Sequence, residues 1–414
     1  MNQQVDIVIA GAGPAGATAS LFLCREKIPH FVIDKSFFPR DKICGDAISG
    51  KTSDILHKLN TEIHREIEMQ SDRFLPCNGI LFSAPNGKML EVPFSNNISA
   101  LKYPAGYTSK RFHFDEFLFR KIDRKVATVL EGAEIKTITR IPEGIELTYD
   151  HDRIEHKLKC KLLVGAEGDR SLTARALGAY KKNPEHYSAA VRAYYRNVKG
   201  MHEQNFIELH FLKGILPGYF WIFPLPGGDA NVGVGIPSHI VSRKKINLKD
   251  EMVKIIHEHP IFKERFRHSE PVGEIKGWGL PLGSEQRVIS GDNFLLTGDA
   301  ASLIDPFTGE GIGNAMLSGM KAAEQVKRSI AANDFSKNFL GKYDEEVYRN
   351  CGAELKLSHR LQKLGNKAWL INLFFNKAGR SKAFREYLPL ILYNPEDRKA
   401  LSNIRFYFKL LFGY

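Results

Sequence analysis

The stretch Val5–Gly16, which reads VDIVIAGAGPAG, decides the fold of this chain. Residues Val5–Ala10 are mostly β-branched and apolar, so they predict a short buried strand of a parallel sheet. Glycines follow at once at positions 11, 13 and 16, in the frame G-x-G-x-x-G. In that frame the first glycine allows a tight turn, the second lets a pyrophosphate approach the backbone, and the third lets a helix pack on the strand.

The residues after the glycines complete the unit that such a turn requires. Residues 17–27 read as a helix, and residues 30–35 read as a second strand that carries Asp34 near its end. Asp34 lies 18 residues beyond Gly16, close to the spacing at which an acidic side chain binds a ribose hydroxyl. We therefore predict that the chain binds an adenine dinucleotide, and this unit alone leaves NAD, NADP and FAD open.

The composition indicates a folded chain of more than one domain. At 414 residues it exceeds the usual domain size of about 100–200 residues, so two or three domains are expected. The hydrophobic content of 43% supports a full core. The five cysteines include no C-x-x-C pair, and an odd number of widely spaced cysteines argues against a disulfide framework. A reducing, cytoplasmic setting is therefore expected.

Charge and hydropathy restrict the partners. Neither secretion nor membrane insertion is expected, because the N-terminus has no basic leader and no stretch approaches the roughly 20 apolar residues of a spanning helix. The net charge is +12, but many of the basic residues are interleaved with acidic ones, and we expect no nucleic-acid partner. Residues 365–414 mix Lys and Arg with aromatic and aliphatic residues at helical spacings. They predict a helical layer packed on the body of the protein, or else a peripheral contact with a membrane or a lipid.

A second glycine pattern competes for the role of phosphate site. Gly45 is followed after four residues by Gly50-Lys51-Thr52, which matches the phosphate loop of nucleoside triphosphatases. Such a loop must leave a buried strand and open a helix, but the preceding residues 35–44 carry Pro39 and several charges and show no strand pattern. We therefore expect no ATP or GTP site in this segment.

Two later segments identify the cofactor through a resemblance. Residues 160–178 place a strand, Leu162–Val164, before a glycine-containing turn. Residues 293–324 place the strand Phe294–Thr297 before a Gly-Asp pair and a second glycine-rich turn. Together with the opening unit, these segments resemble the FAD-dependent oxidoreductases with a p-hydroxybenzoate-hydroxylase-like fold.

The resemblance implies roles for several residues. The aspartate of the Gly-Asp pair, here Asp299, typically binds the ribityl chain in that superfamily, and the turn Gly309–Gly313 lays backbone N–H groups against the N1/O2 edge of the flavin. N–H groups at a helix N-terminus stabilise negative charge there. The middle motif of the superfamily has aspartate where this chain has Glu167, so no contact is carried over to that residue. Arg111 resembles an arginine that faces the ribityl and pyrophosphate region, and the alternative is a surface arginine at a helix start.

One FAD site therefore follows from the resemblance. The expected cofactor-binding residues are Gly11, Gly13, Pro14, Ala15, Gly16, Asp34, Lys35, Cys44, Gly45, Arg111, Gly168, Asp299, Gly309, Gly311, Ile312 and Gly313. No second G-x-G-x-x-G unit is present for a stably bound nicotinamide cofactor, so a transient donor, NAD(P)H or a redox protein, is expected to reduce the flavin. No cysteine and histidine spacing suits zinc, and no metal site is expected.

Runs of short strands interrupt the nucleotide-binding elements, and one of them predicts a hairpin that turns at Asn86-Gly87. The predicted fold class is α/β, with a Rossmann-like FAD-binding domain, an inserted mixed or antiparallel β-sheet substrate domain and a C-terminal helical region. The expected boundaries are 1–75, 100–178 and 287–345 for the FAD-binding domain, 76–99 and 179–286 for the substrate domain, and 346–414 for the helical region.

Two motifs narrow the family. Tyr219, Trp221 and Phe223, with Pro224 after them, match the Y-x-W-x-F-P pattern of the geranylgeranyl reductase branch. Residues 38–49, FPRDKICGDAIS, resemble the P-R-x-K-x-C-G segment of the same branch. The resemblance covers about residues 1–345 and implies a reductase that saturates carbon–carbon double bonds of an isoprenoid or other lipid. It also places the phosphate-loop pattern near the flavin ring, so that match is accidental.

Each motif has a plain structural alternative. Alternate aromatic residues on a strand share one face and usually pack in a core, whereas the resemblance implies that these three and Pro224 line an apolar substrate tunnel. Cys44 is either a small buried hydrophobic residue or a catalytic thiol that donates or relays a proton. The second reading is open because the neighbouring Arg40, Lys42 and Lys51 can lower a thiol pKa.

Two other functions stay open on the sequence. Related folds turn reduced flavin onto O₂, so a flavin-dependent monooxygenase or halogenase is the main alternative. Tyr219 and Phe223 stand where the halogenase pattern W-x-W-x-I-P has Trp and Ile, which counts against halogenation. A flavin-bearing binding protein that holds a lipid without chemistry is a third class.

Overall fold

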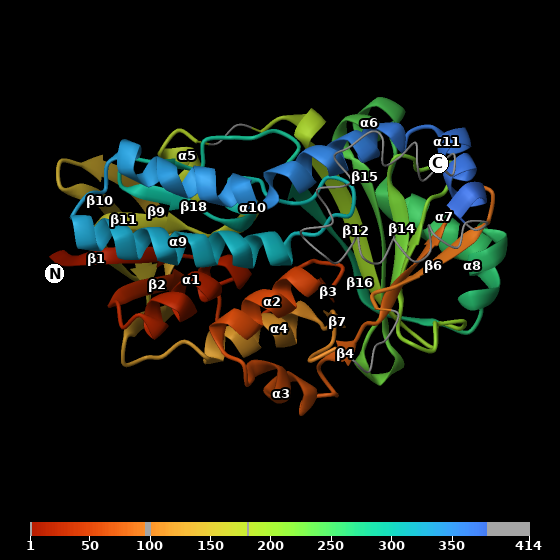
Figure 1. The fold of residues 1–414 in the computed structure, drawn as a ribbon, viewed down its shortest axis with the longest axis horizontal. Helices are drawn as coiled ribbons and strands as arrows, with labels where there is room; N and C mark the ends of the chain where they lie inside the picture. Colours follow the sequence, from red (N-terminus) through yellow and green to blue (C-terminus); the bar gives the residue numbers. More distant parts are fainter. Residues whose placement is uncertain (1, 96–100, 180–181, 379–414) are drawn as a thin grey trace.

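A computed structural model describes residues 2–95, 101–179 and 182–378, which form two large β-sheets and the helices that cover them (Figure 1). The first sheet contains eight strands, in the order β17-β18-β11-β1-β2-β8, with β10 paired to β11 and β9 paired to β10. The strands are β1 (Asn2–Ala10), β2 (His30–Asp34), β8 (Ala127–Glu131), β9 (Glu134–Ile141), β10 (Gly144–His151), β11 (Ile154–Gly165), β17 (Ser290–Gly291) and β18 (Phe294–Leu296). β1 pairs in parallel with both β11 and β2, as a dinucleotide-binding sheet requires.

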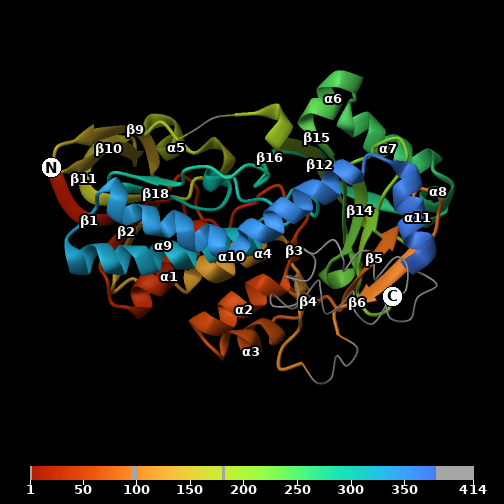
Figure 2. The same ribbon diagram turned by 45° about the horizontal axis from the view of Figure 1, so that its top comes forward.

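Helices pack on the first sheet or on the helices beside it. They are α1 (Pro14–Arg25), α2 (Gly50–Leu59), α3 (Ile63–Glu68), α4 (Arg111–Arg120), α5 (Leu172–Ala176), α9 (Ile312–Ala332) and α10 (Lys337–Leu364). α9 and α10 lie side by side over the sheet (Figures 1 and 2). α9 also approaches α1 closely, because a Cβ on Gly319 would lie 2.2 Å from the carbonyl oxygen of Ala15. α9 therefore packs directly on the first turn of α1.

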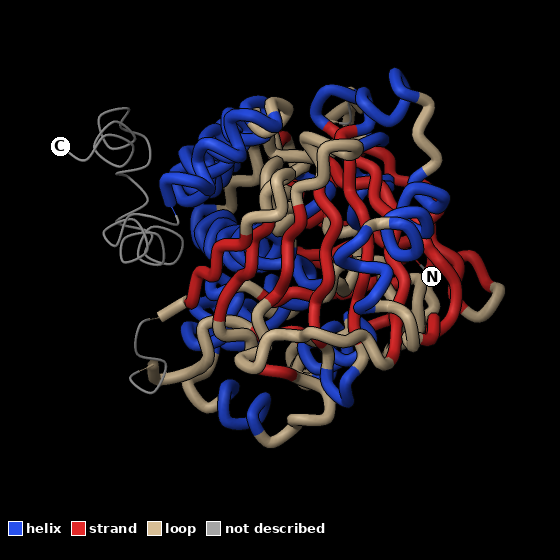
Figure 3. The backbone as a smooth tube through the Cα atoms, turned by 90° about the vertical axis from the view of Figure 1, so that its right-hand side faces the viewer, coloured by secondary structure: helices blue, strands red, loops and turns tan. Residues whose placement is uncertain are grey.

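The second sheet has seven strands in the order β16-β12-β15-β14-β13-β5-β6. Figure 3 looks onto this end of the molecule, with the strands in red. The seven strands are β5 (Gly79–Ser83), β6 (Met89–Pro93), β12 (Tyr187–Arg196), β13 (Ile207–His210), β14 (Tyr219–Pro224), β15 (Ala230–Pro237) and β16 (Glu270–Pro281). All pairs are antiparallel except β13 with β5, so the sheet is mixed. One face packs on α6 (Ser238–Lys244), α7 (Leu248–Glu258) and α8 (Pro260–Arg265) in a separate hydrophobic core. The other face looks toward the first sheet. A small sheet of β3 (Ala47–Ile48), β4 (Leu75–Pro76) and β7 (Tyr107–Thr108) completes the fold.

The predicted fold class is confirmed. The hairpin between β5 and β6 turns at Asn86-Gly87, where Gly87 has a φ of +81°. The strand predicted at Leu162–Val164 is the end of the twelve-residue β11, whose charged first half gave no apolar signal. The chain enters the second sheet through β5 and β6 and again through β12–β16, as expected for an inserted unit.

The C-terminal region differs from the expected division. α10 runs without a break from residue 337 to residue 364, so the expected boundary at 345/346 falls inside one helix. α11 (Ala368–Ala378) follows it and lies beside β6 (Figure 2). Phe375 and Ala378 of α11 share a hydrophobic core with Leu90 and Val92 of β6. The rest of the predicted basic and aromatic tail, 379–414, lies outside the described residues. Among the helices that are described, none is long and apolar enough to cross a membrane.

Candidate functional site

A cavity of about 1150 Å³ lies between the two sheets. It is larger than the roughly 300–1,000 Å³ of an ordinary small-molecule pocket, which leaves room for a cofactor and a second ligand. Most of the sequence-predicted site residues line it. The exceptions are Gly16, Gly313 and Pro224, which are not among the lining residues.

The glycine turn after β1 forms one end of the cavity. Gly11 has a φ of +94°, and a Cβ there would lie 2.6 Å from the carbonyl oxygen of Ala166. A Cβ on Gly16 would lie 1.8 Å from the carbonyl oxygen of Gly11, so this glycine serves packing, which explains why it does not face the cavity. A Cβ on Gly13 would meet only a guanidinium nitrogen of Arg40, at 3.4 Å. The backbone at Gly13 is therefore open to an approaching ligand, and Pro14 and Ala15 continue this wall into α1.

Asp34 lies at the carboxyl end of β2, beside this turn. Its Oδ2 accepts a hydrogen bond from the backbone N–H of Ala12 at 2.7 Å, and its Oδ1 accepts one from Ser36 at 2.8 Å. A carboxylate has about four acceptor positions, so two remain for ribose hydroxyls. Lys35 lines the cavity next to it.

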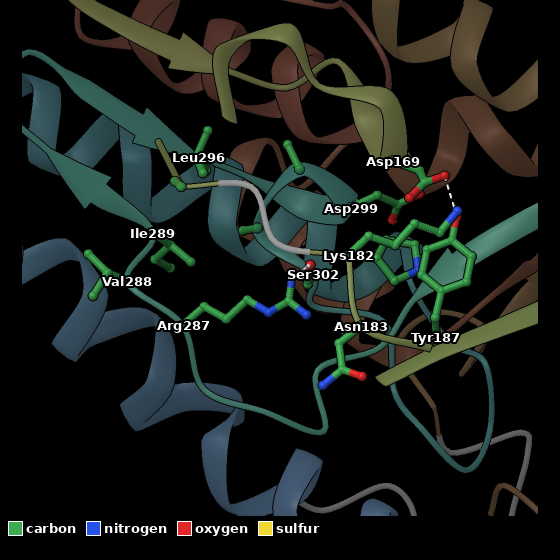
Figure 4. Close-up of a pocket in the computed structure, with 14 residues that line it drawn as sticks. Asp169, Lys182, Asn183, Tyr187, Arg287, Val288, Ile289, Leu296, Asp299 and Ser302 are labelled. Atoms are coloured by element: carbon green, nitrogen blue, oxygen red, sulfur yellow. Dashed lines mark hydrogen bonds between the residues drawn. The ribbon is translucent and has the colours of Figure 1, made fainter. Parts of the chain in front are cut away.

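Asp299 and the second glycine turn form the middle of the cavity. Burial raises the pKa of Asp299, and none of the described residues donates a hydrogen bond to its carboxylate. The turn 309–313 leads into α9, whose N-terminus begins at Ile312, and the N–H of Gly313 is already bonded to Oε1 of Glu310 at 2.5 Å. A smaller pocket shares Asp299 with the large cavity, and in it the Tyr187 hydroxyl donates to Asp169 (Figure 4).

Arg111 and Glu167 bind protein groups. Arg111 lines the cavity and donates to both oxygens of Asp115, at 2.6 and 2.7 Å. Burial alone lowers its pKa, but Asp115 and then Cys44 outweigh that effect, so the pKa of the guanidinium lies above its ordinary value. Glu167 accepts hydrogen bonds from Thr173 N–H at 2.8 Å and from Ser171 Oγ at 2.8 Å, which ties it to the start of α5. Gly168, beside it, has a φ of +79° and faces the cavity.

The phosphate-loop pattern has other contacts in the structure. The strand next to its Gly50-Lys51 pair is the two-residue β3, which lies inside the pattern and pairs antiparallel with β7 in the small sheet. The Nζ of Lys51 lies 2.6 Å from Oδ1 of Asn314 and 3.0 Å from a carboxylate oxygen of Glu354. This lysine therefore ties α2 to α9 and α10.

Cys44 and Gly45 lie where the two sheets meet. The thiol of Cys44 is half-buried and lines the cavity, and its carbonyl oxygen accepts a hydrogen bond from Nδ2 of Asn231 at 2.7 Å. A Cβ on Gly45 would lie 3.0 Å from the ring of Phe223. The Cys44 segment is therefore bound directly to the second sheet.

Asp46 holds the Cys44 segment to the second sheet, and it was not among the residues predicted from the sequence. Asp46 is fully buried and has a φ of +68°. Its Oδ2 accepts hydrogen bonds from the Tyr194 hydroxyl and from Nδ2 of Asn231, both at 2.8 Å, and Oδ1 of Asn231 accepts one from the Trp221 indole at 2.9 Å. Asn231 alternates with Gly233 and Gly235 along an apolar strand, and that isolated polar position was the available signal.

The buried carboxyl of Asp46 predicts a pH effect on stability. Burial raises its pKa from 3.8 to about 6, so the folded protein holds more protons than the unfolded chain between these values. Stability from this group is therefore lost as the pH rises from about 4 to about 6, by up to about 3 kcal/mol. Because Asn resembles the neutral carboxyl, we expect the Tm of wild type minus the Tm of Asp46→Asn to fall as the pH rises over that range. The exposed Asp72→Asn is the control, and a value of this difference that stays constant or rises would contradict the assignment.

The aromatic residues of β14 line the cavity and also pack in a hydrophobic core. Trp221 and Phe223 are 6% and 7% exposed, and the ring centroids of Tyr219 and Trp221 lie 6.1 Å apart. The hydroxyl of Tyr219 donates to the carbonyl oxygen of Thr308, directly before the turn at Gly309. The carbonyl oxygen of Pro224 accepts a hydrogen bond from Thr108, so this residue ends the strand outside the cavity.

The dinucleotide-binding sheet and the second sheet line the same cavity, which is the arrangement expected for a flavoprotein with a cofactor domain and a substrate domain. The chain belongs to the FAD binding domain family, whose family model matches residues 4–346. The protein is therefore an FAD-dependent oxidoreductase.

Relatives and solved structures agree with this assignment. The chain is 28% identical over 372 residues to a digeranylgeranylglycerophospholipid reductase of Methanococcus vannielii, covering 88% of this chain and 89% of the relative. It is 28% identical over 377 residues to a menaquinone reductase of Mycolicibacterium smegmatis, covering 86% and 85%. A geranylgeranyl bacteriochlorophyll reductase-like protein of Thermoplasma acidophilum has the same fold, with a TM-score of 0.81, 21% identity and coverage of 97% and 99%. A flavin-dependent brominase shares the fold too, with a TM-score of 0.75, 21% identity and coverage of 97% and 98%.

The residues present fit FAD. The open backbone at Gly13 suits a pyrophosphate at the N-terminus of α1, and the free acceptor positions of Asp34 suit a ribose. The carboxylate of Asp299 lines the cavity without a hydrogen-bond donor among the described residues, and ribityl hydroxyls are donors of the required kind.

Proposed function

We propose that the protein is an FAD-dependent reductase that saturates carbon–carbon double bonds of an isoprenoid or lipid. The observation that carries this proposal is the contact between Tyr219, at the start of the aromatic wall, and Thr308, at the start of the flavin turn. It sets an apolar wall directly beside the place expected for the flavin ring. The names of the two relatives, a phospholipid reductase and a menaquinone reductase, support reduction of an apolar substrate.

The wall continues beyond the aromatic row. Leu209 of β13 and Ile80 and Phe82 of β5 line the cavity beside Trp221. A polyprenyl chain gains about 0.8 kcal/mol for each CH₂ that it buries, so a wall of this length favours a long hydrocarbon.

The chemistry requires a hydride and a proton in a site closed to water. FAD supplies the hydride when it is bound and reduced. The residues of this chain exclude water with the aromatic wall and hold a proton near the substrate. We propose Cys44 for the second role, because its half-buried thiol lines the cavity and interacts with the buried Arg111.

Cys44→Ala and Cys44→Ser are expected to retain FAD and to lose alkene reduction by about 100-fold, the usual contribution of one proton-transfer group. The measurement is anaerobic single turnover with product mass. Cys24→Ala, which removes another half-buried thiol from α1, is the matched control and should be unaffected. Full activity in both Cys44 variants would remove Cys44 from the mechanism and leave the reductase proposal standing.

The main alternative is a flavin-dependent monooxygenase or halogenase, which the shared fold of the brominase favours. The electron donor on either proposal is transient NAD(P)H or a redox protein. Anaerobic addition of a polyprenyl diphosphate to the chemically reduced protein separates the two, because only the reductase reoxidises its flavin without O₂.

We also propose a cytoplasmic protein that touches membranes peripherally. The five free cysteines suit a reducing compartment. Trp369 and Leu373 of α11 are 63% and 42% exposed, next to the basic Lys367, which is the composition of an interfacial helix.

A further inference from the structure

One row of paired residues crosses the cavity face of the second sheet from β16 to β5. Each residue is the register partner of the next, in the order Lys276, Arg192, Gly233, Trp221, Leu209 and Phe82. All of them except Gly233 line the cavity, and the Trp221 indole covers Gly233, because a Cβ there would lie 2.2 Å from Cζ2 of the indole. The row therefore begins with two cations and ends with an apolar surface.

The cationic end has unused hydrogen-bonding capacity. Arg192 is only 3% exposed, and its Nη2 donates to both oxygens of Asp41, at 2.8 and 3.0 Å. Its Nε is buried and has no partner among the described residues. The Nζ of Lys276 lies 3.3 Å from the same carboxylate and is half-exposed. Two cations thus share one acid, and a buried N–H of this kind ordinarily has an acceptor.

Two further cations lie beside this pair. The Nζ of Lys42 lies 4.1 Å from the centroid of the Trp278 ring, and the guanidinium of Arg170 lies 5.2 Å from it. Trp278 precedes the apolar end of β16 and lines the cavity. Lys42 and Arg170 therefore add positive charge at Trp278, two residues along β16 from Lys276, and this charge suits an anion with more than one negative charge.

The position of this charge relative to the apolar end indicates what the anion is attached to. Adjacent strands lie about 4.8 Å apart, so the backbone of Arg192 is about 10 Å from that of Trp221 and about 20 Å from that of Phe82. A molecule with an anionic head and a long hydrocarbon chain spans such a row from end to end.

We propose that Arg192 and Lys276 bind a phosphate or diphosphate group that does not belong to FAD. The apolar end of the row binds the hydrocarbon chain attached to this phosphate group. That the chain is an isoprenoid or lipid chain rests on the proposed reductase function. A phosphate-bearing lipid, rather than an uncharged quinone, is then the substrate. The phosphates of a nucleotide electron donor share this chemistry, so the test includes them.

The test compares two probes with the same chain, geranylgeranyl diphosphate and the uncharged geranylgeraniol. Both are titrated into the oxidised, FAD-loaded full-length protein, and binding is read from the change in flavin absorbance, without turnover. Arg192→Gln is expected to weaken the diphosphate about tenfold or more and to leave the alcohol unchanged, as the loss of a charged hydrogen-bond donor predicts. Lys276→Gln should weaken the diphosphate less, because this side chain is half-exposed.

The matched control is Arg196→Gln, on the same strand, whose side chain is exposed and pairs with Asp229 outside the cavity. It should change neither probe. Asp41→Asn removes the competing carboxylate and should tighten the diphosphate alone. NADPH is titrated in parallel, and if it, rather than the diphosphate, depends on Arg192 and Lys276, the phosphate site stands and its ligand is the nucleotide donor.

Other outcomes overturn the inference. Equal binding of both probes in wild type and all variants would remove the phosphate site but not the reductase, which is tested by turnover. Failure of both probes to bind would contradict the proposed substrate class as well. If Arg192→Gln loses FAD, the variants Lys276→Gln and Asp41→Asn show whether the cations bind a separate phosphate. Unchanged diphosphate binding in both would assign the cations to the cofactor instead.

Discussion

Gly13→Val protein is expected to fold and to purify without FAD. A side chain at this position would meet only the guanidinium of Arg40, at the end of a flexible side chain, so the apoprotein has room for it. The same side chain would occupy the space through which a pyrophosphate approaches the N-terminus of α1. The measurement is the flavin absorbance per mole of purified protein, together with Tm. Stoichiometric FAD in this variant would contradict the cofactor site.

Gly16→Val is the matched comparison, three residues away in the same turn. Its Cβ would lie 1.8 Å from a backbone oxygen of Gly11, which cannot move independently of the turn. We expect this variant to be unstable with or without added FAD. The pair separates loss of the cofactor from loss of the fold, which one variant alone does not.

Trp221→Ala is expected to retain FAD and to lose about 100-fold in kcat/KM for alkene reduction. The substitution removes the centre of the apolar wall and the indole N–H that holds Asn231, which in turn holds the carbonyl of Cys44. A displacement of about 1 Å in such a support can cost about 100-fold in rate. Steady-state kinetics and FAD content are the measurements.

Two other variants isolate the cause. Trp221→Phe keeps an aromatic wall but lacks the hydrogen bond to Asn231, so we expect a smaller loss. Trp369→Ala removes an exposed tryptophan of α11 and should leave kcat/KM for a soluble substrate unchanged. Wild-type kinetics in Trp221→Ala would show that the aromatic row is core only, which is the structural alternative for residues on one strand face.

The first strand, helix and second strand could be predicted because their signals are local. Gly16 is required by an atom of the unit itself, the carbonyl oxygen of Gly11, and Gly11 by the carbonyl oxygen of Ala166 directly beside it, whereas Gly13 leaves the backbone open to a ligand. No local sequence pattern predicts the strand order of the second sheet. Its neighbours β13 and β5 lie far apart in the sequence and pair in parallel, and only packing in three dimensions selects that arrangement.

The site shows the same division. Cys44 and Trp221 were found through motifs, but Asp46 and Asn231, which join them, were not. The importance of Asp46 comes from complete burial and from partners on three separate segments, none of which a linear pattern records. Glu167 had a visible departure from the family motif, and its bonds to Ser171 and Thr173 account for that departure by giving the longer side chain a local role.

The central claim is that this protein reduces a carbon–carbon double bond. The direct measurement is to reduce the bound flavin chemically under strict anaerobiosis, add geranylgeranyl diphosphate or an unsaturated isoprenoid phospholipid, and follow flavin reoxidation together with product mass. We expect reoxidation without O₂ and a product that gains two hydrogens for each double bond reduced. Reoxidation that occurs only with O₂, with an added oxygen atom in the product or an added halogen when halide is present, would contradict it.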